Sequence, residues 1–196
     1  MALEIELKFP VEDFDPFVSV LRNKGKKLSP WYFEQNIVLD TQDQILKKKD
    51  ILLRLRKGLN HDLLTLKLPA VDPEGLAKKR EELETRVEDV SVLKDIFGAL
   101  GFFPFLRYEK FRQKWKLEGG KVCLDILPFG QFIEIEGESF EQMLEILHLR
   151  PEDGTKKTYY ELFQDFLKSH NLPPEESFVF SNNEKKAIAA RLNVKI

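Results

Sequence analysis

The stretch EIELKF at residues 4–9 alternates charged and apolar residues without a break. Successive side chains of a β-strand point to opposite faces, so Glu4, Glu6 and Lys8 share one face and the apolar residues between them share the other. A half-exposed sheet also has one polar and one apolar face. The first strand therefore leaves open whether its charged face meets solvent or an interior.

The same alternation recurs far along the chain, and most of the charged faces carry a single sign. The acidic bank consists of Glu4, Glu6, Glu134 and Glu136. The basic bank consists of Arg54, Arg56, Lys67, Lys110 and Arg112. A solvent-exposed face usually carries charges of both signs and includes Ser, Thr and Gln. Strand faces with charges of nearly one sign therefore favour an enclosed charged cavity.

The strand pattern predicts an α+β fold in which eight antiparallel strands close into a barrel with a charged interior. Closure gives the apolar faces an outer layer of helices and removes the sheet edges. The predicted strands are Ala2–Phe9, Phe33–Asp40, Ile51–Lys57, Asp62–Leu68, Leu76–Val87, Tyr108–Leu117, Val122–Leu127 and Gln131–Glu138. Helices are predicted at about 16–24, 91–100, 139–147, 158–169 and 182–192.

Length and composition indicate one domain over residues 1–196. The formal net charge of -2 shows no basic excess, so we expect no nucleic-acid or membrane-surface partner. A single cysteine, Cys123, excludes a disulfide framework and a multi-cysteine zinc site. The acidic start of the chain is unlike a signal peptide, and no apolar run approaches about 18 residues. We therefore expect a cytoplasmic protein.

A cavity lined by both banks suits a polyphosphate together with its metal ion. Carboxylate oxygens are ligands for Mg²⁺ or Mn²⁺, which complete their coordination with water and phosphate. Glu4 and Glu6 lie about 7 Å apart along a strand, close enough for both to reach one ion. Arginine forms forked hydrogen bonds to phosphate oxygens, and lysine adds a point charge.

The ordered motifs resemble the CYTH domain family, the triphosphate tunnel metalloenzymes. The signature E-x-E-x-K corresponds to Glu4–Lys8. The motifs that follow it are Arg54-Leu55-Arg56, Thr65-Leu66-Lys67, Arg80–Glu84, Lys110-Phe111-Arg112, Leu124-Asp125, Phe132–Glu136 and Lys157–Leu162. The resemblance covers about residues 2–167 and leaves 168–196 as a C-terminal helical extension.

This resemblance implies a tunnel-shaped barrel that acts on triphosphates with a divalent metal, and it assigns roles to residues. Metal binding is implied for Glu4, Glu6, Asp125, Glu134 and Glu136. Phosphate binding is implied for Lys8, Arg54, Arg56, Lys67, Arg80, Lys110, Arg112 and Lys157. Glu82 and Glu84 would orient these bases, and the catalytic group would be Glu4, Glu6, Lys8 and Arg56. Val38 and Leu39 stand where members of the family often carry aromatic residues.

Three functions remain open at this point. The first is a metal-dependent hydrolase of an inorganic, thiamine or nucleoside triphosphate. The second is a class IV adenylate cyclase that forms cyclic AMP and pyrophosphate in the same cavity. The third is a non-catalytic polyphosphate-binding module, against which the complete acidic bank argues. The partner is a small-molecule triphosphate in each case, and a dimer is left open.

Two further groups are interpreted as structural. The basic run Lys47–Lys49 is typical of a solvated loop. Phe102, Phe103 and Phe105 are interpreted as hydrophobic packing after a helix.

Overall fold

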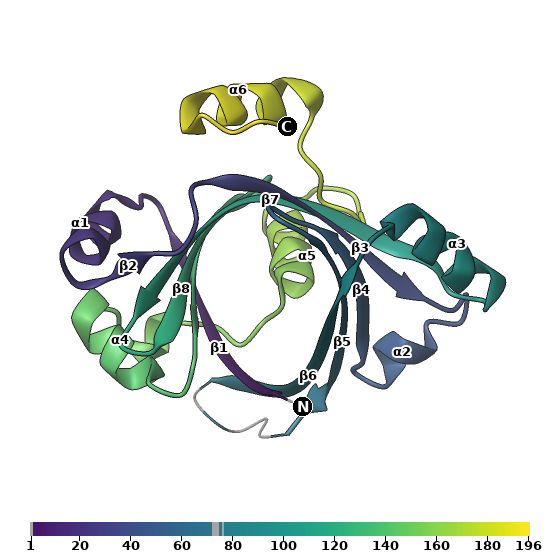
Figure 1. Ribbon diagram of the computed structural model, residues 1–196, viewed down its shortest axis with the longest axis horizontal. Helices are drawn as coiled ribbons and strands as arrows, with labels where there is room; N and C mark the ends of the chain where they lie inside the picture. Colours follow the sequence, from purple (N-terminus) through teal and green to yellow (C-terminus); the bar gives the residue numbers. More distant parts are fainter. Residues whose placement is uncertain (1, 72–74, 76) are drawn as a thin grey trace.

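Nine strands in the described residues form one antiparallel sheet, and eight of them close into a barrel (Figure 1). The computed structural model describes residues 2–71, 75 and 77–196. The barrel order is β7-β3-β4-β5-β6-β1-β9-β8, and pairing of β8 with β7 completes the ring. The strands are β1 (Ala2–Val11), β2 (Lys26–Lys27), β3 (Tyr32–Asp40), β4 (Leu52–Lys57), β5 (Asp62–Ala70), β6 (Lys78–Val87), β7 (Phe103–Leu117), β8 (Gly120–Leu127) and β9 (Gly130–Glu136).

The long strand β7 makes closure possible because it pairs with two barrel neighbours. It pairs with β3 through Phe103–Arg112 and with β8 through Phe111–Leu117. The two-residue strand β2 adds to β7 outside the ring, opposite Trp115 and Lys116. The predicted eight-stranded barrel is confirmed, and β2 is an additional strand that the sequence pattern did not reveal.

Alternation along the strands separates two cores. On β1, Glu6 and Lys8 are buried inside the barrel, whereas Leu7 and Phe9 point outward and are buried in the outer core. The helices supply that outer layer, as predicted. They are α1 (Asp15–Lys24), α2 (Ile45–Lys48), α3 (Val90–Ala99), α4 (Phe140–Leu147), α5 (Tyr159–Ser169) and α6 (Asn182–Leu192), with a short 3₁₀ turn at Pro151–Asp153.

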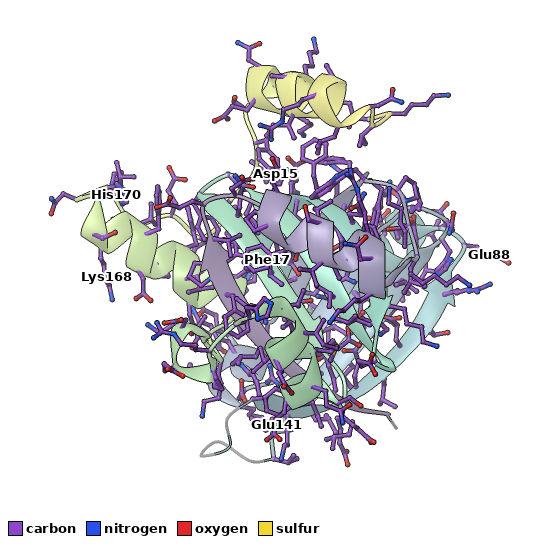
Figure 2. All side chains as sticks on the ribbon, turned by 90° about the vertical axis from the view of Figure 1, so that its left-hand side faces the viewer. Asp15, Phe17, Glu88, Glu141, Lys168 and His170 are labelled. Atoms are coloured by element: carbon purple, nitrogen blue, oxygen red, sulfur yellow. The ribbon has the colours of Figure 1, made fainter. Side chains whose placement is uncertain are left out.

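Two of these helices cover one flank of the barrel side by side. Leu21 of α1 and Met143 of α4 belong to the same buried cluster as Leu7 and Phe9. Figure 2 faces this flank and shows α1, with Phe17 labelled, beside α4, with Glu141 labelled. Their apolar stripes account for the burial of the outward-facing residues of β1.

Helix α5 lies across one end of the bore (Figure 1). Its first turn is fixed by a capping box, in which the Thr158 hydroxyl accepts from the Glu161 backbone N–H and the Glu161 carboxylate accepts from the Thr158 backbone. The Tyr159 hydroxyl then reaches into the barrel. The start of α5 therefore forms part of the interior surface.

Helix α6 and the residues before it contact the outside of β7, and Lys185 also lies over the ring of Phe33 in β3. Phe180, just before it, packs on Phe111 with 5.4 Å between ring centroids. Lys185 Nζ lies 2.7 Å from Glu109 Oε1, a carboxylate that is almost fully buried. The C-terminal extension is thus attached to the barrel wall rather than to the bore.

Some element boundaries differ from the sequence prediction. Strand β7 begins at Phe103 rather than Tyr108, so Phe103 and Phe105 are strand residues and not packing after a helix. Leu76, the predicted first residue of its strand, lies outside the described residues. No helix in the described part of the chain is long and apolar enough to cross a membrane.

Candidate functional site

A cavity of about 400 Å³ lies within the barrel and is lined by both charged banks. The acidic bank comes from β1 and β9, which pair with Glu6 opposite Glu136 and Lys8 opposite Glu134. The basic bank comes from β4, β5 and β7. The nine residues assigned to the two banks all line this cavity, as the alternation predicts.

Lysine side chains separate the carboxylates of the acidic bank. Lys8 Nζ lies 2.7 Å from Glu6 Oε1 and 3.6 Å from Glu134 Oε2. Lys67 forms an ion pair with Glu4. Lys121, which is half exposed, lies 2.5 Å from Glu136 Oε1. Each carboxylate of the bank therefore has one ammonium neighbour.

Burial and charge move the carboxylates of β1 in opposite directions. Burial raises the pKa of Glu4 to about 7. The ammonium group of Lys67 lowers this pKa, and the negative charges of Glu6 and Glu82 offset part of that lowering. Burial would also raise the pKa of Glu6, but the ammonium groups of Lys8 and Lys67 lower it to about 2. Glu4 is thus the carboxyl of this pair that takes up a proton near neutral pH.

Arg54, which lines the cavity, has one buried donor without a hydrogen-bond partner. Its Nη1 donates to the Tyr108 hydroxyl at 3.0 Å and its Nη2 to Thr65 Oγ1 at 3.3 Å. Its Nε is buried and has no hydrogen-bond partner. A buried N–H without an acceptor is costly, so this position favours an anionic ligand.

The neighbouring Arg56 is held in a more complete network. Its Nε donates to Asn36 Oδ1 at 3.0 Å and lies 3.3 Å from Glu34 Oε1. Glu34 is also 3.6 Å from Lys110 Nζ. Burial would raise the pKa of Glu34, but Arg56 and Lys110 hold it far below its usual range. Glu34 therefore fixes two members of the basic bank.

Asp125 is placed differently from the metal ligand that the resemblance implies. It is fully buried and accepts from Arg112 Nε at 2.6 Å, from Lys110 Nζ at 3.1 Å and from the Tyr159 hydroxyl at 2.7 Å. Arg112 Nη2 also contacts it. These donors occupy both carboxylate oxygens of Asp125. The residue therefore holds Lys110 and Arg112 of the basic bank and the first residue of α5 in place.

Lys157 is the one predicted phosphate-binding residue that lies away from the cavity. Its Nζ is 2.6 Å from Asp165 Oδ2, and both side chains are about half exposed. The residues after it, from Thr158 to Glu161, line the cavity instead. The motif Lys157–Leu162 thus contributes the start of α5 to the cavity lining, and not its lysine.

The remaining predicted residues are brought together. Arg80 is buried, donates to the Leu68 carbonyl at 2.7 Å and lies 2.7 Å from Asp50 Oδ1. Glu82 Oε2 is 3.1 Å from Lys67 Nζ. Glu84 accepts from the Thr65 hydroxyl at 3.2 Å. Glu82 therefore contacts a base of the cavity, whereas the contact of Glu84 is to the hydroxyl of Thr65.

Several interior residues escaped sequence reasoning. Lys114 is two residues beyond Arg112 and lies on the same face of β7 as Lys110 and Arg112, so the alternation could have identified it. Glu34 shares a face with Asn36, but the adjacent polar residue Gln35 conceals the alternation. Tyr108 gives no such signal, because a tyrosine fits either face of a strand.

The donor chemistry of the acidic bank fits Mg²⁺ or Mn²⁺. Among the described residues, no three Asp, Glu, His or Cys side chains converge on one point. Mg²⁺ commonly takes one or two protein carboxylates and fills its shell with water and substrate phosphate. The repulsion of Glu4 by Glu6 and Glu82 would be relieved by a cation. Glu4, Glu6, Glu134 and Glu136 are the residues that would hold it.

Comparison with known proteins supports the motif-based resemblance. The CYTH domain family model matches residues 2–159. A Methanocaldococcus jannaschii protein named "Putative adenylate cyclase" is 28% identical over 173 residues, which cover 82% of this chain and 98% of that protein.

Two solved structures share the fold. One, from Vibrio parahaemolyticus, is also described as a "putative adenylate cyclase"; it has a TM-score of 0.72 at 19% identity and covers 83% of this chain and 98% of its own. The other, from Hippeastrum, is described as a "putative adenylyl cyclase" with a dominant triphosphatase activity. It has a TM-score of 0.54 at 19% identity and covers 100% of this chain and 98% of its own.

Proposed function

The chain belongs to the CYTH domain family, and on this basis we propose that it hydrolyses a triphosphate compound inside the barrel with Mg²⁺ or Mn²⁺. Arg54 carries the proposal, because it lines the cavity beside other cations and its buried Nε has no hydrogen-bond partner. A phosphate oxygen is the acceptor that satisfies both its hydrogen bond and its charge. The acidic bank, which contacts the basic bank through the ion pairs of Lys67 with Glu4 and of Arg112 with Glu134, would hold the metal.

The basic bank would bind the phosphate chain and stabilise the charge that develops during transfer. Arg54 and Arg56 are prepositioned by Thr65, Tyr108 and Asn36, so they need little reorganisation. Lys110 and Arg112 are held by Asp125. The bound metal would neutralise phosphate charge and lower the pKa of an attacking water.

The fold is compatible with hydrolysis. The Hippeastrum protein, which has the same barrel, is described as having a dominant triphosphatase activity. Lys8 holds its proton firmly, because burial lowers its pKa less than Glu6 and Glu134 raise it. It would act as a fixed positive charge between the acidic bank and the phosphates.

Adenylate cyclase activity is the second candidate, and the name of the Methanocaldococcus jannaschii relative favours it. In that reaction the ribose 3′-hydroxyl attacks the α-phosphorus and pyrophosphate leaves. Both reactions need the same cations around the phosphates. They differ in the atom that is positioned for attack.

Product analysis separates these functions. The protein would be incubated with ATP, inorganic triphosphate or thiamine triphosphate in the presence of Mg²⁺ or Mn²⁺. We expect orthophosphate, and we expect excess EDTA to abolish its release. Cyclic AMP with pyrophosphate would establish the cyclase, and absence of turnover with every compound would leave the polyphosphate-binding module.

A matched pair of variants ties turnover to the cavity. Arg56→Ala should lose turnover, since it removes a buried cation that lines the cavity. Arg150→Ala should retain it, because Arg150 is exposed and pairs with its near neighbours Glu152 and Asp153. Full activity of Arg56→Ala, or full activity in EDTA, would contradict the proposal.

A further inference from the structure

The cavity is apolar and aromatic at the end where α5 begins. Val38, Leu52 and Leu106 line it there. The strand registers place Val38 opposite Arg54 and Leu52 opposite Lys67. The apolar compartment therefore directly adjoins the cations of the basic bank.

A β-bulge adds an aromatic ring to this compartment. Leu39 pairs with Pro104 and Val38 pairs with Leu106, which leaves Phe105 as the extra residue of β7. Consecutive strand residues normally face opposite ways, but a bulge re-aims a side chain. Phe105 and Leu106 accordingly both line the cavity.

Tyr160 at the start of α5 supplies a second ring. Its centroid lies 6.3 Å from that of Phe105, with an interplanar angle of 58°. Its hydroxyl donates to Glu176 Oε2 at 2.6 Å, which fixes the side chain. Strand β7 and helix α5 thus each supply one aromatic ring to the compartment.

Lys47 sits over both rings. Its Nζ is 4.6 Å from the Phe105 centroid and 4.8 Å from the Tyr160 centroid, and it donates to the Tyr160 hydroxyl at 3.3 Å. Lys47 belongs to α2, and the buried carboxylate of Asp40 holds this helix by accepting from the backbone N–H groups of Leu46 at 3.0 Å and Lys47 at 2.9 Å. Lys47 is therefore a positioned residue and not part of a freely solvated loop.

We infer that this compartment binds a neutral heteroaromatic base attached to the triphosphate, so that the substrate class is a nucleoside triphosphate. The inference rests on the proposed function of the charged part of the cavity. The base would displace the Lys47 ammonium from the face of Phe105 or Tyr160 and stack there, and its ring nitrogen or carbonyl would accept a hydrogen bond from that ammonium. The phosphate chain would extend toward Arg54.

The charge of Lys47 makes the compartment selective. A cation placed over an aromatic face is attracted to it, and here Lys47 already occupies that position. A cationic ring such as the thiazolium of thiamine triphosphate would have to approach an ammonium group. Inorganic triphosphate would leave the compartment unfilled. A neutral base meets neither disadvantage.

The test compares ATP with ribose 5′-triphosphate, which has the same phosphates and sugar but no base. Base stacking on an aromatic side chain is worth about tenfold or more in binding. We expect the wild type to favour ATP in kcat/KM by at least that factor. Phe105→Ala should reduce the ratio about tenfold. Phe103→Ala, which changes an exposed ring on the same strand that does not line the cavity, should keep the wild-type ratio.

Two further variants complete the experiment. Phe105→Leu keeps an apolar side chain without a ring and replaces Phe105→Ala if that variant fails to fold. Lys47→Met should raise the kcat/KM of thiamine triphosphate relative to ATP, because it frees the aromatic faces for a cation.

The outcomes distinguish this inference from the proposed function. Equal use of ATP and ribose 5′-triphosphate by the wild type, or an unchanged ratio in the Phe105 variants, overturns the base site while hydrolysis stands. If no triphosphate is hydrolysed, the proposed function fails. Calorimetric titration with ATP and ribose 5′-triphosphate then decides the base site, and equal affinities would overturn it.

Discussion

At the scale of single residues, Arg54 offers a direct test of the phosphate site. Two of its nitrogens are held by Tyr108 and Thr65, the buried Nε has no partner, and the residue lines the cavity. Arg54→Lys keeps the charge but loses the forked geometry. Because a hydrogen bond to a charged group contributes about 1.5–3 kcal/mol, we expect kcat/KM to fall about ten- to a hundred-fold. Steady-state kinetics with inorganic triphosphate would measure this loss, and Arg150→Lys serves as the exposed control.

Glu4 predicts a pH dependence of stability in the metal-free protein. Its pKa rises from 4.5 to about 7 on folding, so its contribution to stability is fully present below pH 4.5 and is lost as the pH rises through about 7. Glu6 has a lowered pKa, so its contribution is lost only as the pH falls toward about 2.

Thermal unfolding in EDTA at about pH 5 and about pH 8 tests this sign. The wild type should lose more stability between the two values than Glu4→Gln, which cannot titrate at this position. Parallel behaviour of the two proteins would show that Glu4 keeps its ordinary pKa.

At the scale of elements, the two capping boxes form a matched pair. Thr158 begins α5 beside the cavity, and Ser181 begins α6 on the outer wall. Replacing either N-cap by alanine removes the same hydrogen bonds and should cost about 1 kcal/mol, which lowers the Tm by about 2–4 °C. Only Thr158→Ala should also lower kcat/KM, because Thr158 lines the cavity. Equal kinetics of the two variants would mean that the start of α5 does not shape the site.

The elements also show where sequence reasoning reaches its limit. The strand pattern identified all eight barrel strands, although Gln35 interrupts the alternation of β3. It did not identify β2, since Lys26 and Lys27 have no alternation and pair only because β7 is long enough to accept them. The bulge at Phe105 is likewise a result of strand pairing and not of local pattern.

At the scale of the whole molecule, closure of the barrel decides which predicted site residues meet. Residues whose position follows from strand parity, such as Arg56 and Glu134, line the cavity as predicted. Lys157 precedes a helix, so its direction depends on how α5 docks through Tyr159 onto Asp125. That contact is tertiary, and no spacing in the sequence reveals it. Asp125 points to the expected side of its strand, but its partners come from β7 and α5, which only the fold brings together.

The closed barrel also concentrates charges that a ligand should stabilise. A ligand present at about 100 times its Kd adds about 2.7 kcal/mol, which corresponds to a rise in Tm of about 5–10 °C for a chain of this size. We expect this rise with Mg²⁺ plus inorganic triphosphate. Either compound alone should raise the Tm less. Mg²⁺ alone leaves the basic bank without an anion, and triphosphate alone leaves the acidic bank without a cation.

Glu136→Gln distinguishes a functional charge from a structural ion pair. Glu136 lies opposite Glu6 in the β1–β9 register, and its partner Lys121 is half exposed, so the pair contributes little. The variant without ligand should therefore melt at the wild-type temperature or above it, while the increase with Mg²⁺ plus triphosphate should shrink. Differential scanning calorimetry with and without both compounds measures the two values. A marked loss of stability without ligand, combined with an unchanged increase on adding ligand, would assign Glu136 to the framework of the barrel instead of the metal site.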